Sequence, residues 1–388
     1  MFGDEQLVPW LGTLRDQAPG LELFDAHTHI GSNDPDGFKA TPAQLTGALA
    51  ACDARGVVFP MHDPGGYPPA NDMVIEAAAA SEGRLVAFCR LDPRADPLAE
   101  ARRALGAGAV GIKLHPRAEA FALDSPELSD VFALAGARGL PVLVHAGRGI
   151  PALGRHAVAI CERHPDLRLI LAHAGISDLA WIWRATEEHR NLFFDTAWWS
   201  ASDLLALYAL VAPRHIVFAS DAPYSSPSFA AVANLRCALQ AGLSPESLRS
   251  VFGGQIARIV AGEEAADAGP APGRSALDHD LLLERVHTFL VAALGQMFAG
   301  CDPAEQLQLA ALAGKVGEET PQAPTCAAVL HLLELRAGQA ESGADEGRPA
   351  RFAPGLPLIV LAACVARTPA AALPPLAVAE QDVGERAG

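Results

Sequence analysis

Eight short apolar segments alternate with segments of helical periodicity, and this pattern constrains the fold of the 388-residue chain more than any other feature. The apolar segments lie at 21–24, 57–59, 85–88, 110–114, 141–144, 167–171, 192–194 and 216–218. Strands that are apolar on both faces and alternate with helices are typical of an all-parallel sheet. Eight such strands close a TIM barrel, so the sequence predicts an α/β fold with a (β/α)8 barrel over residues 1–260.

Three of the intervening segments begin with a capping residue followed by proline, a combination that favours the first turn of a helix. These pairs are Thr41-Pro42, Asp96-Pro97 and Ser125-Pro126. In the first of them Gln44 follows Thr41 by three residues, which is the spacing of a capping box. The sequence therefore predicts a helix after each pair.

A doubly wound open sheet is the alternative fold, and residues 106–111 match the pattern G-x-G-x-x-G. These glycines follow a predicted helix and precede a predicted strand, whereas a dinucleotide-binding loop follows a strand and opens a helix. We therefore interpret them as the end of a helix and a turn.

The chain changes character after the predicted barrel. Residues 261–275 are rich in Ala, Gly, Pro and acidic residues, which predicts a linker. Residues 276–388 are predicted to form a small all-α extension, because apolar residues recur there at helical spacing, with loose segments at 338–354 and after residue 369. Such an apolar face must pack on the barrel or on another chain, so we expect a homo-oligomer, a dimer, and no catalytic group from this extension.

Composition narrows the classes of partner. The net charge of −16 argues against binding to nucleic acid. The N-terminus lacks the pattern of a signal peptide, and the longest apolar run, at 356–366, is shorter than the roughly 18 residues of a membrane span. Seven dispersed cysteines are best explained as reduced thiols. These features predict a cytoplasmic protein that binds neither nucleic acid nor membrane and acts on a small molecule.

Polar residues gather at the ends of the predicted strands, where the active sites of TIM barrels are assembled. His27 and His29 are two residues apart at the end of the first strand, so their side chains point to the same face and can act as a pair of metal ligands. The other strand ends carry His62, Arg90, Lys113, His115, His145, His173 and Asp221. We therefore predict a metal site at this end of the barrel.

Five motifs in this order resemble the metal-dependent amidohydrolase superfamily. They are Asp-Ala-His-Thr-His at 25–29, Gly-Ile-Lys-Leu-His-Pro at 111–116, Val-His-Ala-Gly at 144–147, Ala-His-Ala-Gly at 172–175 and Ala-Ser-Asp-Ala-Pro-Tyr at 219–224. The branch resembled is amidohydrolase family 2, which includes aminocarboxymuconate semialdehyde decarboxylase. The resemblance covers about residues 22–260, and it departs from the family at Gln255, where the family normally has Asn.

The resemblance implies one divalent metal ion, zinc with manganese as the alternative. The implied ligands are His27, His29, His145 and Asp221, and the residue matching His173 is implied to be an acid/base or electrophile beside the ion. Three neutral imidazoles and one carboxylate leave the ion with net positive charge and an open position for water, whose pKa falls towards ~7. Asp221 can bind the ion or take the proton of that water.

The predicted activity is hydrolysis of a C–N or C–O bond in a small, carboxylate-bearing substrate by metal-activated water. Non-oxidative decarboxylation on the same metal frame is the alternative, and the ligand set does not separate the two reactions. A barrel without catalytic activity is a third possibility, but the intact set of ligand residues argues against it.

The candidate substrate-binding residues are Lys113, His115, Arg148 and Arg90. Either arginine could clamp a carboxylate. Lys113 has three interpretations: a carboxylated lysine that bridges two metal ions, an ammonium group that contacts substrate, or a structural ion pair. Trp198, Trp199 and Tyr224 could stack on a planar substrate or could pack at the barrel rim.

Overall fold

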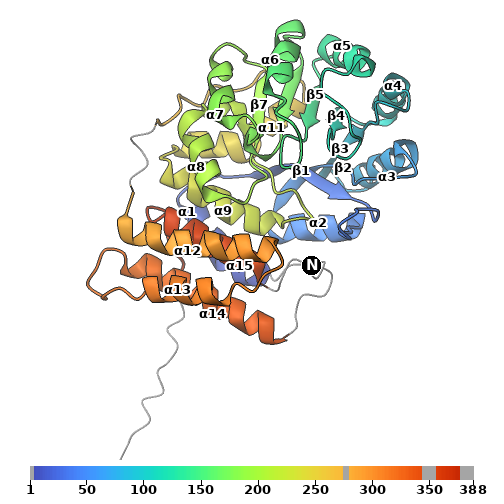
Figure 1. The fold of residues 1–388 in the computed structure, drawn as a ribbon. Coiled ribbons are helices and arrows are strands. Elements are labelled where there is room, and N and C mark those ends of the chain that lie inside the picture. Colours follow the sequence, from blue (N-terminus) through green and yellow to red (C-terminus); the bar gives the residue numbers. More distant parts are fainter. Residues whose placement is uncertain (1–3, 274–278, 343–354, 376–388) are drawn as a thin grey trace, which may run out of the picture.

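The computed structural model describes residues 4–273, 279–342 and 355–375. Its first part is a sheet of eight parallel strands whose order follows the chain (Figure 1). The strands are β1 (Leu23–Ile30), β2 (Ala54–Pro60), β3 (Leu85–Arg90), β4 (Gly111–Leu114), β5 (Pro141–Val144), β6 (Arg168–Leu171), β7 (Leu192–Asp195) and β8 (Ile216–Val217). The two edges meet where Ala26 N donates to Phe218 O (2.8 Å) and His29 N donates to Ala222 O (2.7 Å). The predicted (β/α)8 barrel is confirmed.

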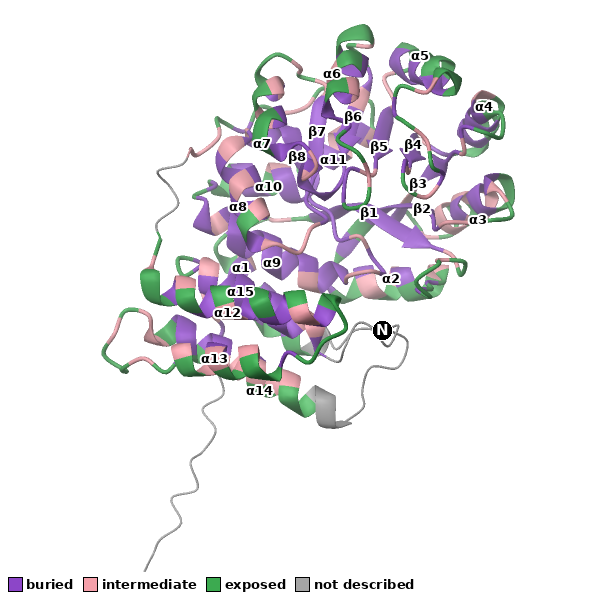
Figure 2. Ribbon diagram, viewed as in Figure 1, coloured by how far each residue is buried: buried purple, intermediate pink, exposed green. Residues whose placement is uncertain are grey.

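Helices surround the barrel, and the strands inside it are buried (Figure 2). Those of the barrel region are α1 (Val8–Asp16), α2 (Pro42–Ala51), α3 (Tyr67–Ala79), α4 (Pro97–Ala107), α5 (Ser129–Ala137), α6 (Gly154–Arg163), α7 (Leu179–Ile182), α8 (Ala201–Leu210), α9 (Pro227–Gln240), α10 (Pro245–Arg249) and α11 (Gln255–Val260). The sequence pattern does not predict α1, which packs against α9.

Two of the three predicted helix starts are confirmed. Thr41 forms a capping box with Gln44 at the start of α2, and the Asp96 side chain accepts a hydrogen bond from Ala99 N at the start of α4. Ser125 is different, because its side chain makes no capping bond and a short 3-10 helix (Pro126–Leu128) precedes α5. Gly108 ends α4 with a φ of 126°, so the glycines before β4 form a helix end and turn as predicted.

The described residues after the barrel form four further helices, which confirms the predicted helical region. They are α12 (Leu281–Phe298), α13 (Ala304–Ala313), α14 (Ala323–Ser342) and α15 (Leu356–Arg367). Helix α14 extends past Gly338, where a loose segment was expected. Residues 370–375 form no helix or strand, as expected after residue 369, whereas 343–354, 376–388 and the end of the predicted linker, 274–275, lie outside the described residues.

Helix α15 is the buried centre of this extension and is not predicted by the sequence. All residues from Leu358 to Ala366 are buried, and the helix contacts α12 and α14 on one side and α8 and α9 of the barrel on the other (Figures 1 and 2). The short apolar run at 356–366 is therefore a core helix that joins the extension to the barrel.

Arg236 on α9 fastens α15 to the barrel. Its buried guanidinium donates to Thr368 Oγ1 (2.9 Å), Thr368 O (2.7 Å) and Ala372 O (2.9 Å), so it binds the chain directly after α15. Where α9 and α15 pack together, the Sγ atoms of Cys237 and Cys364 are 3.7 Å apart. All seven cysteines are free thiols.

Gln255, the residue that departs from the family pattern, holds the irregular segment after α11. Its amide nitrogen donates to Arg214 O (2.6 Å) and Ala266 O (3.0 Å), and its amide oxygen accepts from Ala266 N (3.0 Å). Because all three bonds are to backbone groups, the role of Gln255 is structural, in keeping with the expectation for that segment.

Among the described helices, α12 is long and apolar enough to cross a membrane by length and composition, with a mean hydropathy of 1.3 over 18 residues. Its buried side chains lie on one face and include Leu283, Val286, Leu290 and Leu294. That face packs against α13 and α15, which is the pattern of a helix in a packed bundle.

Candidate metal centre

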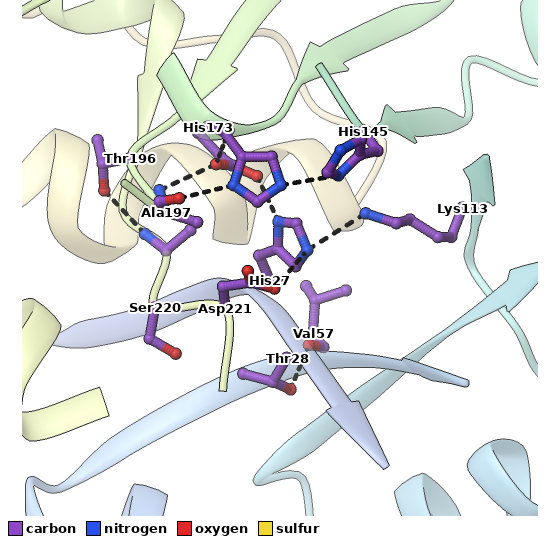
Figure 3. Close-up of polar contacts among 12 residues, drawn as sticks. His27, Thr28, Val57, Lys113, His145, His173, Thr196, Ala197, Ser220 and Asp221 are labelled. Carbon is purple, nitrogen blue, oxygen red and sulfur yellow. Dashed lines mark hydrogen bonds and ion pairs between the residues drawn. The ribbon is translucent and has the colours of Figure 1, made fainter. Parts of the chain in front are cut away.

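Three ligand-type side chains converge at the ends of β1 and β8. His27 Nε2 and His29 Nε2 are 3.2 Å apart, and Asp221 Oδ1 lies 3.2 Å from the first and 3.1 Å from the second. These atoms could together hold a metal ion. Figure 3 shows His27 and Asp221 facing each other, with Lys113 and His173 beside them.

The backbone explains this convergence. His27 and His29 both point into the barrel end because side chains two residues apart share a face of a strand. Thr28 points away, and its hydroxyl donates to Val57 O on β2 (2.7 Å). Asp221 has a φ of 62° and its backbone N donates to His27 O (2.9 Å), so a left-handed turn directs its carboxylate back to β1.

Asp195 at the end of β7 sets the tautomer of His27. Nδ1–H of His27 donates to Asp195 Oδ2 (2.7 Å), so the lone pair of Nε2 faces His29 and Asp221. Asp195 Oδ1 accepts from the backbone N–H groups of His173 (2.8 Å) and Ala197 (3.0 Å). Burial would raise the pKa of Asp195, but its contact with the His27 imidazole and these hydrogen bonds lower it below its usual value.

Asp195 is a residue that the sequence analysis missed. The sequence could have indicated it, because Asp195 directly follows the apolar segment 192–194. The other candidate site residues also lie at or directly after the ends of the predicted strands. The contacts of Asp195 now give every strand end from β4 to β8 a polar group near the same centre.

The three converging atoms fit a divalent metal ion. Two imidazole nitrogens and one carboxylate oxygen are ligands that zinc accepts, and atoms 3.1 to 3.2 Å apart can all lie about 2.0–2.2 Å from one ion. Burial lowers the pKa of His29 to about 3, so this imidazole is neutral and its nitrogen is available as a ligand. Asp221 has a pKa well below its usual value: burial opposes this shift, but His27 and His29 outweigh it.

His173 and His145 form a second group beside the triad. Nδ1–H of His173 donates to Ala197 O (2.7 Å), which leaves the lone pair on Nε2 to accept from Nδ1–H of His145 (2.9 Å). His145 also stacks on His115, with ring centroids 3.9 Å apart. Three of the four implied ligands therefore converge, whereas His145 lies against His173, and its role as a ligand stays a prediction.

The glycines of the two His-Ala-Gly motifs are required by close packing. A Cβ at Gly147 would lie 2.7 Å from Cδ2 of His173, and one at Gly175 would lie 2.8 Å from the Phe194 ring. His173 itself has a φ of 58°, an uncommon backbone conformation that marks a sharp turn after β6. Each motif thus places an imidazole and removes the side chain that would collide with its surroundings.

Lys113 points at the metal centre from β4. Its Nζ lies 3.2 Å from His27 Nε2 and 4.5 Å from the centroid of the Phe59 ring (Figure 3). The side chain is fully buried, and this burial lowers its pKa to about 7. Among the described residues no carboxylate lies within ion-pair distance of Nζ, so the structure shows no ion pair for Lys113, and the other two interpretations stay predictions.

The two predicted arginines have different surroundings. Arg90 is buried and donates to Glu119 Oε1 (2.7 Å), which also accepts from Tyr67 Oη (2.5 Å). Arg148 is exposed, and within the described part of the chain no acidic side chain pairs with it. Arg148 is therefore free to bind an anion, while the charge of Arg90 is already balanced by Glu119, a buried residue that the sequence did not reveal.

A cavity of about 520 Å³ opens above these groups. The predicted site residues all line it, namely His27, His29, Arg90, Lys113, His115, His145, Arg148, His173 and Asp221. Trp198, Trp199 and Tyr224 line it too, and Tyr224 Oη donates to Asp34 Oδ2 (2.6 Å).

An eight-stranded parallel barrel with histidines and an aspartate at its strand ends defines a TIM-barrel enzyme with a candidate metal centre. A comparison of the sequence with protein families identifies the family within this class. The model described as Amidohydrolase matches residues 24–260, and the chain belongs to this family, which is generally metal-dependent. It is an enzyme of the amidohydrolase superfamily. No curated protein matches the chain.

Solved structures share the barrel. An uncharacterized TIM-barrel protein from Bordetella bronchiseptica is 16% identical, with a TM-score of 0.52 over 62% of this chain and 99% of that one. 5-Carboxyvanillate decarboxylase from Sphingomonas paucimobilis is 18% identical, with a TM-score of 0.51 over 62% and 99%. IDCase from Metarhizium anisopliae is 16% identical, with a TM-score of 0.50 over 64% and 99%. At this identity the likeness concerns the fold alone.

Proposed function

We propose that this protein is a metal-dependent hydrolase that cleaves a C–N or C–O bond in a small, carboxylate-bearing substrate. The observation that carries the proposal is the convergence of His27 Nε2, His29 Nε2 and Asp221 Oδ1 within 3.2 Å of one another at the floor of a cavity. These three residues would hold one divalent ion, zinc or manganese, with His145 as the fourth candidate ligand. When bound, such an ion supplies a Lewis acid and lowers the pKa of a coordinated water towards about 7.

The side chains around the triad can move the protons of a hydrolysis. The Asp221 carboxylate is ionised and can accept a proton from the attacking water. His173 Nε2 carries a lone pair and is held by the bond from Nδ1–H to Ala197 O, so this nitrogen can receive a proton and return it to the leaving group. Lys113 Nζ can donate a hydrogen bond to an oxygen of the substrate.

The positive charges in the lining of the cavity support the proposal that the substrate is an anion. The chain has a net charge of −16, yet Arg148 and Arg117 line the cavity and have no acidic partner among the described residues. Two unpaired guanidinium groups at the mouth of a cavity attract a carboxylate and can bind it in a bidentate manner.

The test is a screen of lactones, amides and aromatic acids with the zinc-loaded and manganese-loaded protein in H2(18)O. We expect turnover that depends on the metal and places (18)O in the carboxyl product. Release of carbon dioxide without uptake of (18)O would overturn hydrolysis in favour of non-oxidative decarboxylation. Turnover that persists after chelation, with no metal detected, would overturn the metal dependence.

A further inference from the structure

The C-terminal extension reaches the substrate cavity. Phe298 is the last residue of α12, and Leu356 and Val360 lie in the first turns of α15; all three line the cavity. They face the cavity together with Phe229 and Ala230 from the start of α9. The family match covers residues 24–260, so the part of this wall formed by Phe298, Leu356 and Val360 lies outside the matched region.

Phe298 joins the extension to an aromatic cluster at the end of β7. Its ring makes a T-shaped contact with Trp199 at 5.4 Å, and Trp199 lies 6.0 Å from Trp198. Trp198 in turn is 6.2 Å from the His173 ring, and Nε1–H of Trp198 donates to Asp203 (2.7 Å). An aromatic surface therefore runs from His173, beside the metal centre, to the extension.

A cationic group borders this surface. The Arg148 guanidinium carbon lies 5.6 Å from the centroid of the Phe298 ring, and Arg148 has no acidic partner in the described part of the chain. The Phe298 side chain is 36% exposed although it is large and apolar. An exposed aromatic ring beside an unpaired guanidinium, inside a cavity, is suited to a ligand that has both a ring and an anionic group.

The extension holds this wall in a fixed position. Helix α15 is buried along its length between the barrel and the other helices of the extension, and Arg236 binds the chain that follows it. The apolar wall is therefore part of the folded structure, and its side chains can discriminate between ligands at little cost in conformational entropy.

We propose that the extension is a specificity element of the active site, and that the substrate is a carboxylate that also carries an aromatic ring. Its ring packs against Phe298, Leu356 and Val360, and its carboxylate binds Arg148. This inference rests on the proposed function only in placing substrate in this cavity, because the binding of product-like acids requires no turnover.

The test compares propionate and 3-phenylpropionate by isothermal titration with the full-length, zinc-loaded protein. We expect the phenyl acid to bind more tightly, and Phe298→Ala to reduce this preference by roughly two- to tenfold, the scale of one aromatic contact. Val360→Ala should reduce it as well. Arg148→Gln should weaken both acids and leave the preference unchanged. Val291→Ala, at a 36% exposed position of the same helix that does not line the cavity, is the matched control.

The proposal is overturned if Phe298→Ala and Val360→Ala both retain the wild-type preference while circular dichroism and metal content remain normal. It is also overturned if Val291→Ala reduces the preference as much as Phe298→Ala does. If the preference changes as expected but no acid derivative is hydrolysed, the wall is supported and the proposed hydrolysis is what fails.

Discussion

Asp195 at the end of β7 binds Nδ1–H of His27 on β1 at 2.7 Å, from the other side of the metal centre. The bond orients the His27 ring so that its free nitrogen faces His29 and Asp221. A carboxylate in this position also makes the imidazole a stronger ligand. A residue outside the converging triad thereby determines how well the triad can hold a metal ion.

We expect Asp195→Asn to weaken zinc binding by about 10- to 100-fold, because the amide does not supply the negative charge that His27 contacts. Competition with a chromophoric chelator would measure the affinity. Asp178→Asn is the matched control, since Asp178 is a buried aspartate that accepts backbone bonds from Leu153 and Gly154 and does not line the cavity. Equal losses in the two variants would show a general effect on folding.

Metal content tests the triad directly. The purified protein should hold about one divalent ion per chain, and the double variant His27→Ala/His29→Ala should hold none, because it removes two of the three converging ligands. Elemental analysis of both proteins gives the answer. Full occupancy in the double variant would show that the ion binds elsewhere. Two ions per chain would favour the carboxylated, bridging form of Lys113 and a role for His145 and His173 as ligands.

His173 should act in proton transfer without holding the ion. We expect His173→Asn to retain most of the zinc and to lose activity by at least ~100-fold, the usual scale for a general acid/base. Zinc content and kcat measured on the same preparation separate the two roles. Loss of zinc together with activity would make His173 a ligand.

The sequence predicts the barrel and most of the site because both follow from periodicity. His27 and His29 share a face through the two-residue repeat of a strand, and Asp221 and His173 follow strands whose ends must meet in a closed barrel. Asp195 obeys the same rule and could have been found by it. The periodicity of the sequence is therefore enough to predict which residues lie at the ends of the strands.

The remaining features depend on contacts between distant segments, which periodicity does not encode. Phe298 reaches the cavity only because α12 packs on α15 and α15 packs on α9. Glu119 lies in a loop, and its pairing with Arg90 depends on the path of that loop. Helix α15 has a short apolar run that contains Pro357, and such a run alone does not distinguish a helix from a strand. The sequence therefore did not predict that residues of α12 and α15 would form a wall of the cavity.

Arg236 should contribute to the stability of the contact between the barrel and the extension. Arg236→Met removes three hydrogen bonds and leaves Ala372 O without the guanidinium donor, while Thr368 O keeps only its bond from Ala371 N, so we expect the free energy of unfolding to fall by about 3 kcal/mol. Urea unfolding measures the change. Arg249→Met is the control, because Arg249 donates to Pro19 O at the exposed surface. An equal effect of the two substitutions would contradict a special role for Arg236.

His215 should make the protein less stable in acid, independently of the metal site. It is 3% exposed and lies directly before β8, and its Nδ1–H donates to Leu192 O (2.7 Å). Burial lowers its pKa to about 4 from an ordinary value of 6.5. The unfolded chain therefore binds more protons than the folded chain between these values, and stability falls as the pH falls from 6.5 to 4, by roughly 3 kcal/mol at most for this group.

His215→Gln keeps a donor for Leu192 O but cannot bind a proton in this range, so its stability should depend less steeply on pH between 6.5 and 4. Urea unfolding of the wild type and the variant at half-unit steps gives the two slopes. The metal ligands also titrate in acid, but both proteins contain them, so the difference between the slopes isolates His215. His279→Gln, at a side chain that is 61% exposed, should leave the slope unchanged. Identical slopes for the wild type and His215→Gln would mean that the buried imidazole does not resist protonation, because only a group whose pKa differs between the folded and unfolded chain links stability to pH.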